Sequence, residues 1–192
     1  EPLEDLHFSS GVESSPETFS DDEIVYTMTL PFNTGSSSVF SNSRRYLCWT
    51  TTGAVFLRIR DDSTFIDVHF YDQERFRDKN IENINDFNMA RLDDSALLLA
   101  SSTHVSYRLH SSWAPDPSVE LDTPEGEIIS VIACGDGWFA YAAGNQLRVF
   151  LSGGACIIEE TCLSTIVTMA GRGSQLFVVY DCESLDYEVI DV

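Results

Sequence analysis

The chain has 192 residues, 43% of them hydrophobic, and a formal charge of −20 from 31 acidic and 11 basic residues. This length suffices for one domain with a substantial core or for part of a larger one. The composition argues against membrane insertion, because no stretch approaches the ~20 apolar residues of a spanning helix and the acidic start is unlike a signal peptide.

Basic residues are too few and too scattered for a nucleic-acid-binding face. The largest groups are pairs, namely Arg44 with Arg45, Arg58 with Arg60, and Arg75 with Arg77. A nucleic-acid-binding module normally gathers many cations on one face to release phosphate counterions. We therefore expect these pairs on solvated strand edges and loops, and no direct contact between this segment and nucleic acid.

Residues 1–23 contain eight acidic residues and neither lysine nor arginine. Low hydrophobicity with high net charge does not offset the entropy cost of ordering, so we expect a flexible acidic linker over residues 1–23. Residues 24–30 alternate enough to predict a strand, which Pro31 and Gly35 would end.

Short β-branched and aromatic runs then alternate with tight Gly and Asp turns, a pattern typical of antiparallel hairpins. Between them, residues 72–86 form a long polar interruption, expected to be a surface loop or a short helix. The strands predicted on either side of it are residues 46–51, 55–60 and 65–70, and then 88–92, 96–101 and 105–109.

A third group of strands is predicted at residues 128–134, 138–143, 147–151 and 155–159, and a fourth group begins at residue 165 and reaches its third strand. Ile132-Ala133 with its following Gly-Asp-Gly turn recurs as Met169-Ala170 with Gly-Arg-Gly, and the offset from Ile132 to Met169 is 37 residues. Self-similarity at this period indicates repeated four-stranded units packed against one another, as in propeller blades.

The predicted fold class is therefore all-β, a WD-type β-propeller of about three to four blades over residues 24–192. Propeller rings usually have four to eight blades. Either the strand at 24–30 completes the last blade of a small ring, or further blades exist and the ring is larger. The incomplete fourth blade favours the second alternative and a fragment of a longer protein.

Reactive side chains do not form a recognisable catalytic motif. The four histidines, at positions 7, 69, 104 and 110, have no standard metal-ligand spacing. Asp61-Asp62 and Asp93-Asp94 occupy predicted turns, where aspartate binds local backbone amides. The candidate inner strands at 128–133 and 165–170 contain no Asp, Glu or His. We expect no enzyme, and no catalytic, cofactor-binding or metal-binding residue.

Cysteine and tryptophan are expected to be structural. The five cysteines, at 48, 134, 156, 162 and 182, have no C-x-x-C spacing, and three lie in or beside apolar strands, which favours free buried thiols in a reducing, intracellular compartment. Trp49, Trp113 and Trp138 are predicted to wedge between blades, with an exposed binding role as the alternative.

A series of short motifs between residues 46 and 180 occurs in one order. The motifs are Tyr46-Leu47-Cys48-Trp49 with Gly53, Ile66-Asp67-Val68, Ala96-Leu97-Leu98-Leu99-Ala100, Ser112-Trp113, Pro124-Glu125-Gly126-Glu127, Gly135-Asp136-Gly137-Trp138, Leu147-Arg148-Val149-Phe150, Gly153-Gly154, and Met169-Ala170-Gly171 with Gln175-Leu176. As a series, they resemble the SepB-like middle domain of the acidic nucleoplasmic DNA-binding proteins, also described as the WD-repeat and HMG-box DNA-binding protein family.

This resemblance implies a non-catalytic replisome scaffold in the nucleus, associated with chromatin. Its middle domain would be a six-bladed propeller that homotrimerises and links the CMG helicase, through GINS, to DNA polymerase alpha–primase and other replication factors. Residues 24–192 would then be the first half or so of that ring. The partner-binding residues are not identified by the sequence. A propeller hydrolase or another intracellular adaptor, such as a coat or trafficking protein, is the alternative.

Overall fold

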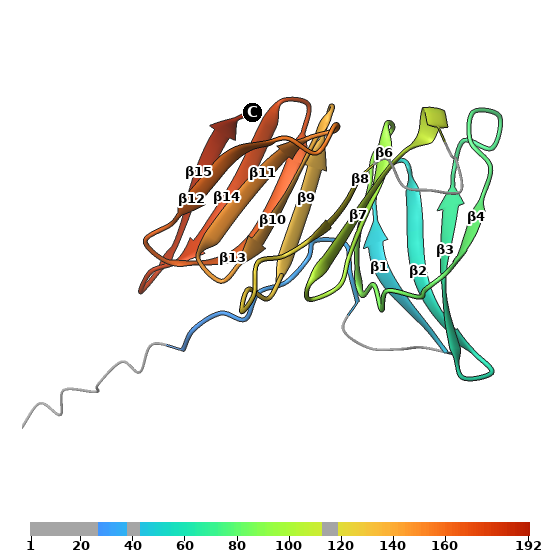
Figure 1. Cartoon of the computed structure of the whole chain (residues 1–192), viewed down its shortest axis with the longest axis horizontal. Coiled ribbons are helices and arrows are strands. Elements are labelled where there is room, and N and C mark those ends of the chain that lie inside the picture. The colour runs from blue at the N-terminus through green and yellow to red at the C-terminus, as the bar shows by residue number, and fades with distance from the viewer. Residues whose placement is uncertain (1–26, 38–42, 113–118) are drawn as a thin grey trace, which may run out of the picture.

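The computed structural model describes residues 27–37, 43–112 and 119–192, which fold almost entirely as β-structure (Figure 1). Within these ranges, no helix is long and apolar enough to cross a membrane. The elements are β1 (Arg44–Trp49), β2 (Gly53–Arg60), β3 (Ser63–Phe70), β4 (Lys79–Glu82), β5 (Met89–Leu92), β6 (Ala96–Ala100), β7 (His104–Leu109), the short 3-10 helix η1 (His110–Ser112), β8 (Val119–Asp122), β9 (Val131–Gly135), β10 (Trp138–Ala143), β11 (Gln146–Leu151), β12 (Cys156–Thr161), β13 (Thr165–Arg172), β14 (Gln175–Asp181) and β15 (Leu185–Asp191).

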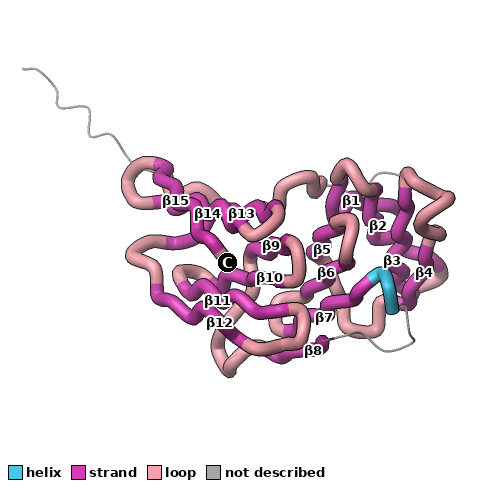
Figure 2. The backbone as a smooth tube through the Cα atoms, turned by 90° about the horizontal axis from the view of Figure 1, so that it is seen from above, coloured by secondary structure: helices cyan, strands magenta, loops and turns pink. Residues whose placement is uncertain are grey.

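The strands form four separate antiparallel meanders in chain order. Three sheets have four strands, β1 to β4, β5 to β8 and β9 to β12, and the described part of the last has three, β13 to β15. Seen from above, the first strands of the four sheets gather along an arc and the later strands fan outward (Figure 2). We call these sheets blades 1 to 4. This radial arrangement is that of a β-propeller and confirms the predicted fold class.

The hairpins form where the turn chemistry predicts them. Between β2 and β3, Asp61 and Asp62 have φ angles of 48° and 67°, and Arg60 pairs with Ser63 across the turn. Left-handed backbone at both central residues is the conformation of a type I′ turn, whose twist matches that of the flanking strands. Asp and Asn adopt it more readily than most residues, so these two aspartates set the hairpin register.

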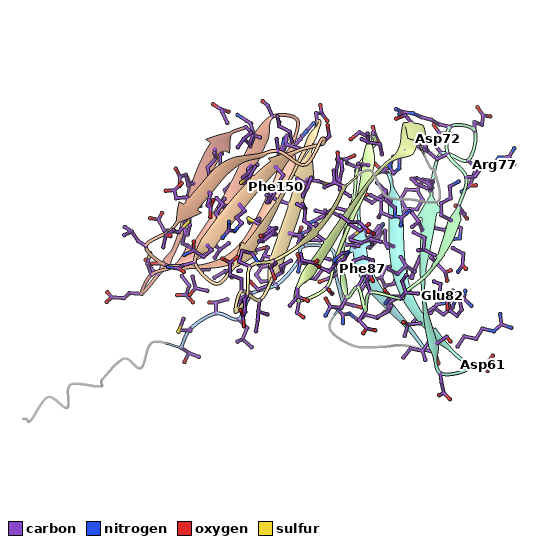
Figure 3. All side chains as sticks on the ribbon, viewed as in Figure 1. Asp61, Asp72, Arg77, Glu82, Phe87 and Phe150 are labelled. Atoms are coloured by element: carbon purple, nitrogen blue, oxygen red, sulfur yellow. The ribbon has the colours of Figure 1, made fainter. Side chains whose placement is uncertain are left out.

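Three apolar layers lie between consecutive blades. Strand β6 shows how one strand serves two of them, because Leu97 and Leu99 face blade 1 whereas Leu98 faces blade 3. A strand buried on both faces has no alternating polar positions, which explains its continuous Ala-Leu-Leu-Leu-Ala sequence. Phe150 lies within the layer between blades 2 and 3, while Asp61 lies at the outer tip of blade 1 (Figure 3).

The prediction of a loop or helix over residues 72–86 is wrong in part, because β4 forms there and pairs with β3. Strand β8 was likewise not predicted, although it pairs with β7. Both are four-residue outer strands, Lys-Asn-Ile-Glu and Val-Glu-Leu-Asp, in which only Ile81, Val119 and Leu121 pack against the apolar layers. One or two apolar residues in a four-residue edge strand give too short an alternation to stand out, so the sequence signal was weak.

The strand predicted at residues 24–30 is also wrong where it can be compared. Residues 24–26 lie outside the described ranges, and residues 27–30 form no strand. The Thr29 amide donates a hydrogen bond to the side chain of Asp181, at 2.5 Å from Oδ2, and not to the carbonyl of a neighbouring strand. The described part of this segment therefore does not complete a blade.

Candidate functional site

The inner strands of the four blades lie side by side around the propeller axis. Strand β1 lies beside β5, β5 beside β9, and β9 beside β13. Two of them, β9 and β13, overlap the candidate inner strands at 128–133 and 165–170, and β9 begins three residues later than predicted. In a propeller enzyme, this axis is where convergent reactive groups would be expected.

The chain's own residues 29–37 occupy this position, and we call them the axial segment. Its backbone and side chains bind all four blades in succession. The Phe32 amide donates to the Val167 carbonyl of β13 at 2.9 Å, and the Ser37 amide donates to the Tyr46 carbonyl of β1 at 3.0 Å. The axial segment therefore links the first and last described blades across the inner strands.

Asn33 fixes the axial segment to blade 3. Its Nδ2 donates to the Ser130 carbonyl at 3.1 Å, and its Oδ1 accepts from the Ile132 amide at 3.0 Å. The side chain is buried, so both main-chain groups would be hard to satisfy otherwise. A carboxamide fits because it offers a donor and an acceptor side by side.

Arg91 of β5 is a buried cation at the centre of the same arrangement. Its Nε donates to the Ile132 carbonyl at 3.0 Å, its Nη2 donates to the Met169 carbonyl at 3.3 Å, and its Nη1 donates to the Thr34 carbonyl. Burial lowers the pKa of Arg91. One guanidinium thus joins blades 2, 3 and 4 and the axial segment through main-chain oxygens, a structural use of its fixed donor geometry.

Ile132 and Met169 are the two positions that the 37-residue sequence repeat aligns. Both present their carbonyls to Arg91, so the repeat corresponds to equivalent positions on neighbouring inner strands. The blades approach closely just beyond them, since a Cβ on Gly171 would lie 2.1 Å from the Cys134 carbonyl oxygen. Glycine is required at Gly171 for that approach.

The tryptophans have different roles from one another. Trp138 is 2% exposed, and its Nε1 donates to the Gly173 carbonyl at 2.7 Å. The prediction that it wedges between blades is confirmed, and the blades are 3 and 4. Trp49 is 66% exposed beside Tyr46, so its prediction as a wedge is wrong. Trp113 lies outside the described residues.

The described histidines are dispersed and do not form a reactive cluster. His69 Nδ1 lies 2.9 Å from Asp78 Oδ2, and His104 Nδ1 lies 2.7 Å from Asp122 Oδ1. His110 Nε2 lies 2.9 Å from the Asp93 carbonyl oxygen, and burial lowers its pKa. His7 is not among the described residues. In the part of the chain that the structure covers, no group of His, Cys, Asp and Glu is arranged to hold a metal ion.

The predicted turn role of Asp93 is confirmed. Its Oδ1 accepts hydrogen bonds from the Ser95 amide at 2.7 Å and the Ala96 amide at 2.8 Å.

All five cysteines are free, and Cys48, Cys134 and Cys162 are buried. Burial raises the pKa of Cys48 to about 12, so its thiol is not activated as a nucleophile.

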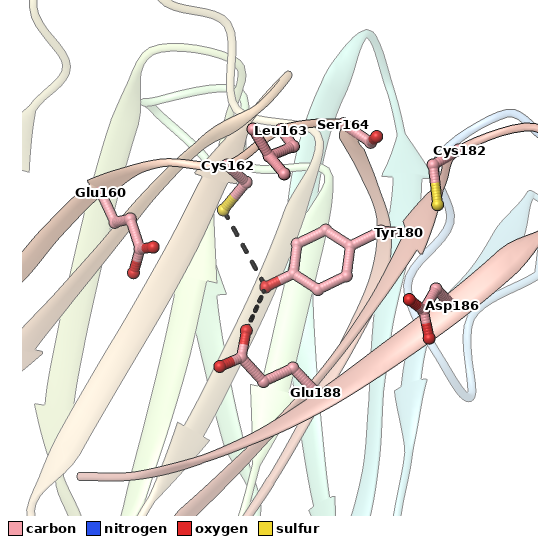
Figure 4. A pocket seen from close by; sticks show the side chains of 8 residues that line it. All are labelled: Glu160, Cys162, Leu163, Ser164, Tyr180, Cys182, Asp186 and Glu188. Carbon is pink, nitrogen blue, oxygen red and sulfur yellow. Dashed lines mark hydrogen bonds between the residues drawn. The ribbon is translucent and has the colours of Figure 1, made fainter.

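A groove lies where the end of β12 and its following loop meet β14 and β15 (Figure 4). The Tyr180 hydroxyl donates to Glu188 Oε2 at 3.1 Å and lies 3.9 Å from Cys162 Sγ. Burial raises the pKa of Tyr180 and that of Cys162. The groove contains no histidine. Its lining residues are Glu160, Cys162, Leu163, Ser164, Tyr180, Cys182, Asp186 and Glu188.

The outward face of blade 4 is apolar and exposed. Phe177 and Tyr187 lie 5.5 Å apart between ring centres, and Val189 pairs with Phe177 on the adjacent strand. All three are exposed. In a propeller, the broad face of each sheet normally packs against the neighbouring blade. The apolar face of blade 4 that is turned away from blade 3 therefore has the character of an inter-blade surface.

Together, these features define the class: an arc of a WD-type β-propeller whose axis is occupied by structural contacts. The chain belongs to the family described as Minichromosome loss protein, Mcl1, middle region, which matches residues 30–192. The resemblance inferred from the motif series is thereby confirmed.

Relatives agree with this assignment. The chain is 30% identical over 174 residues to human WD repeat and HMG-box DNA-binding protein 1, covering 87% of this chain and 15% of the relative. The mouse protein of the same name is 34% identical over 158 residues, covering 78% and 14%. The chain thus spans a small part of the relatives' length. A structure of Kluyveromyces lactis Hsv2 has a TM-score of 0.51 at 11% identity, covering 75% of this chain and 45% of that one, and supports the fold alone.

Proposed function

We propose that this chain is part of a non-catalytic replisome scaffold. In this proposal the complete propeller homotrimerises and links the CMG helicase, through GINS, to DNA polymerase alpha–primase and other replication factors. Membership of the Mcl1 family supports it, as do relatives named as WD-repeat DNA-binding proteins. The nucleus, on chromatin, is the corresponding location.

The axial segment is the observation that carries the non-catalytic assignment. Asn33 and Arg91 use their polar groups on main-chain atoms of the inner strands, where a channel enzyme would need free reactive groups. A rigid ring whose centre is occupied still offers its outer edges and loops to other proteins, as a scaffold requires.

We further propose that residues 1–23 are an acidic linker and residues 24–192 form the first half or so of a six-bladed ring. The open apolar face of blade 4 supports additional blades, because Phe177, Tyr187 and Val189 would become buried against the next sheet. The net charge of −20 supports protein partners in preference to direct DNA contact by this segment.

Co-precipitation from nuclear extract tests the proposal. The full-length protein carrying an affinity tag should recover GINS and DNA polymerase alpha after nuclease treatment, which removes partners joined only through DNA. Recovery of vesicle-coat proteins without GINS would instead support the trafficking alternative. Hydrolysis of a small substrate by the purified protein would support the enzyme alternative.

A further inference from the structure

A small pocket at the outer corner of blade 1 combines aromatic rings with basic side chains. It encloses about 230 Å³ and is lined by Phe70, Arg75, Phe76, Arg77, Lys79 and His110. These residues come from the end of β3, the loop before β4, β4 itself, and η1 of blade 2. Arg77 projects from this corner in Figure 3. None of the residues that line this pocket takes part in the described contacts of the axial segment.

The inner wall of the pocket is a cluster of three rings. Phe70 and Phe76 lie 4.9 Å apart between ring centres, and His110 lies 5.1 Å and 5.0 Å from them. Phe70 is buried and Phe76 is partly buried, so the cluster is anchored in the fold. Burial lowers the pKa of His110, which favours the neutral ring and an apolar inner wall.

The loop that carries the arginines is held by its own aspartates. Asp72 Oδ1 accepts hydrogen bonds from the Glu74 amide at 3.1 Å and the Arg75 amide at 3.0 Å. Asp78 Oδ1 accepts from the Phe70 amide at 3.0 Å. Asp72 thus holds the main chain of the loop and Asp78 ties the loop to β3, so the loop is preorganised to present its cationic side chains.

The lining of this pocket gathers cations in an otherwise acidic chain, beside the loop's own Asp72, Glu74 and Asp78. Three of the 11 basic residues, Arg75, Arg77 and Lys79, line this one pocket of a chain with a net charge of −20. The Arg75 guanidinium lies 4.8 Å from the centre of the Phe76 ring. Arg75 Nη1 also lies 4.0 Å from Asp94 Oδ2, and because both side chains are well exposed, this ion pair is weak.

We propose that this pocket binds an acidic peptide segment of a partner protein, with an apolar side chain against the three rings and flanking carboxylates paired with Arg75 and Arg77. Arginine is suited to this role because its guanidinium binds carboxylates in a bidentate manner. A nucleic acid is disfavoured, since its continuous phosphates would also meet the acidic remainder of the chain. The proposal extends the scaffold function by naming the chemistry of one partner. It rests on the proposed scaffold function, from which we take that the partner is a protein.

Fluorescence anisotropy tests this proposal with a labelled peptide of alternating Asp and Glu around one central leucine. The whole chain should bind it, more weakly as salt rises. R75Q/R77Q should weaken binding about tenfold, because two charge-assisted contacts are lost. The control R60Q/R172Q removes the same charge from exposed arginines elsewhere and should bind as the unchanged chain does. Circular dichroism verifies that both variants remain folded.

Equal loss in the two double variants would overturn the proposal, because the effect would then come from net charge alone. So would equal binding of a peptide with Asn and Gln in place of the acids, or stronger binding of an oligothymidine probe than of the acidic peptide. None of these results would affect the scaffold proposal, which depends on recovery of GINS and DNA polymerase alpha.

Discussion

Asn33 and Arg91 show how individual side chains replace sheet pairing at the propeller axis. Each binds main-chain groups of inner strands that have no neighbouring strand on that side. Neither role could be predicted from sequence, because Asn33 stands in a segment that reads as a turn and Arg91 in one that reads as an ordinary strand. The 37-residue repeat aligned Ile132 with Met169, but did not indicate that both bind Arg91.

Replacing Asn33 by alanine should destabilise the fold. The Ser130 carbonyl and the Ile132 amide would each lose a buried partner, at a cost of about 1–3 kcal/mol. Urea unfolding followed by tryptophan fluorescence measures this loss. Thr34→Ala, whose side chain is exposed on the same segment, is the matched control and should change little. Equal effects of the two substitutions would contradict the role given to Asn33.

Gly171→Ala tests the close approach of blades 3 and 4. The added Cβ would meet the Cys134 carbonyl oxygen, and the backbone shift needed to relieve this should cost about 1–3 kcal/mol. Gly153→Ala is the control, because nothing lies within 4 Å of its Cβ position. Thermal unfolding distinguishes them, and a neutral Gly171→Ala would mean that the blades are less tightly packed than described.

At the scale of whole elements, the predicted hairpins agree with the structure wherever apolar runs alternate with Gly or Asp turns. The runs at 96–101 and 138–143 correspond to β6 and β10 because buried strands carry a dense hydrophobic signal. The outer strands β4 and β8 carry little such signal, and residues 27–30 were misassigned because their partners are distant in sequence. Local pattern predicts a hairpin, but it does not reveal which backbone groups a segment will meet.

Blade 1 contains a cross-strand ion pair that should make its stability depend on pH. Burial alone would raise the pKa of Asp67, but hydrogen bonds from Arg58 at 2.7 Å and Asn80 at 2.6 Å outweigh it and lower the pKa. A carboxyl group whose pKa is lowered by folding stabilises the fold at pH values above its unfolded pKa of about 3.9. This contribution is lost as the pH falls through the folded pKa.

Asp67→Asn should therefore reduce stability at neutral pH, and the difference from the unchanged chain should shrink as the solution is acidified below about pH 4. Urea unfolding across this range measures it. Asp62→Asn, at an exposed turn position on the same hairpin, serves as the control and should show no such convergence. A difference that stays constant with pH would show that the charge of Asp67 is not responsible.

At the scale of the whole molecule, the structure is an arc of four blades with its axis occupied, an apolar face on blade 4 and a basic corner on blade 1. Composition indicated a strongly acidic chain, the strand-turn pattern and the 37-residue repeat indicated an all-β propeller, and the motif series indicated its family. Neither located the axial segment or the basic pocket, because both depend on residues brought together from different blades. The proposed scaffold function follows from this combination of a rigid frame and accessible outer surfaces.

Mass photometry of the full-length protein, alone and mixed with purified GINS, tests this account most directly. We expect a mass of three copies for the protein alone and a further increase when GINS is added, since the account assigns the propeller to assembly and partner binding. A protein that remains at the mass of one copy, with or without GINS, would contradict the proposed scaffold.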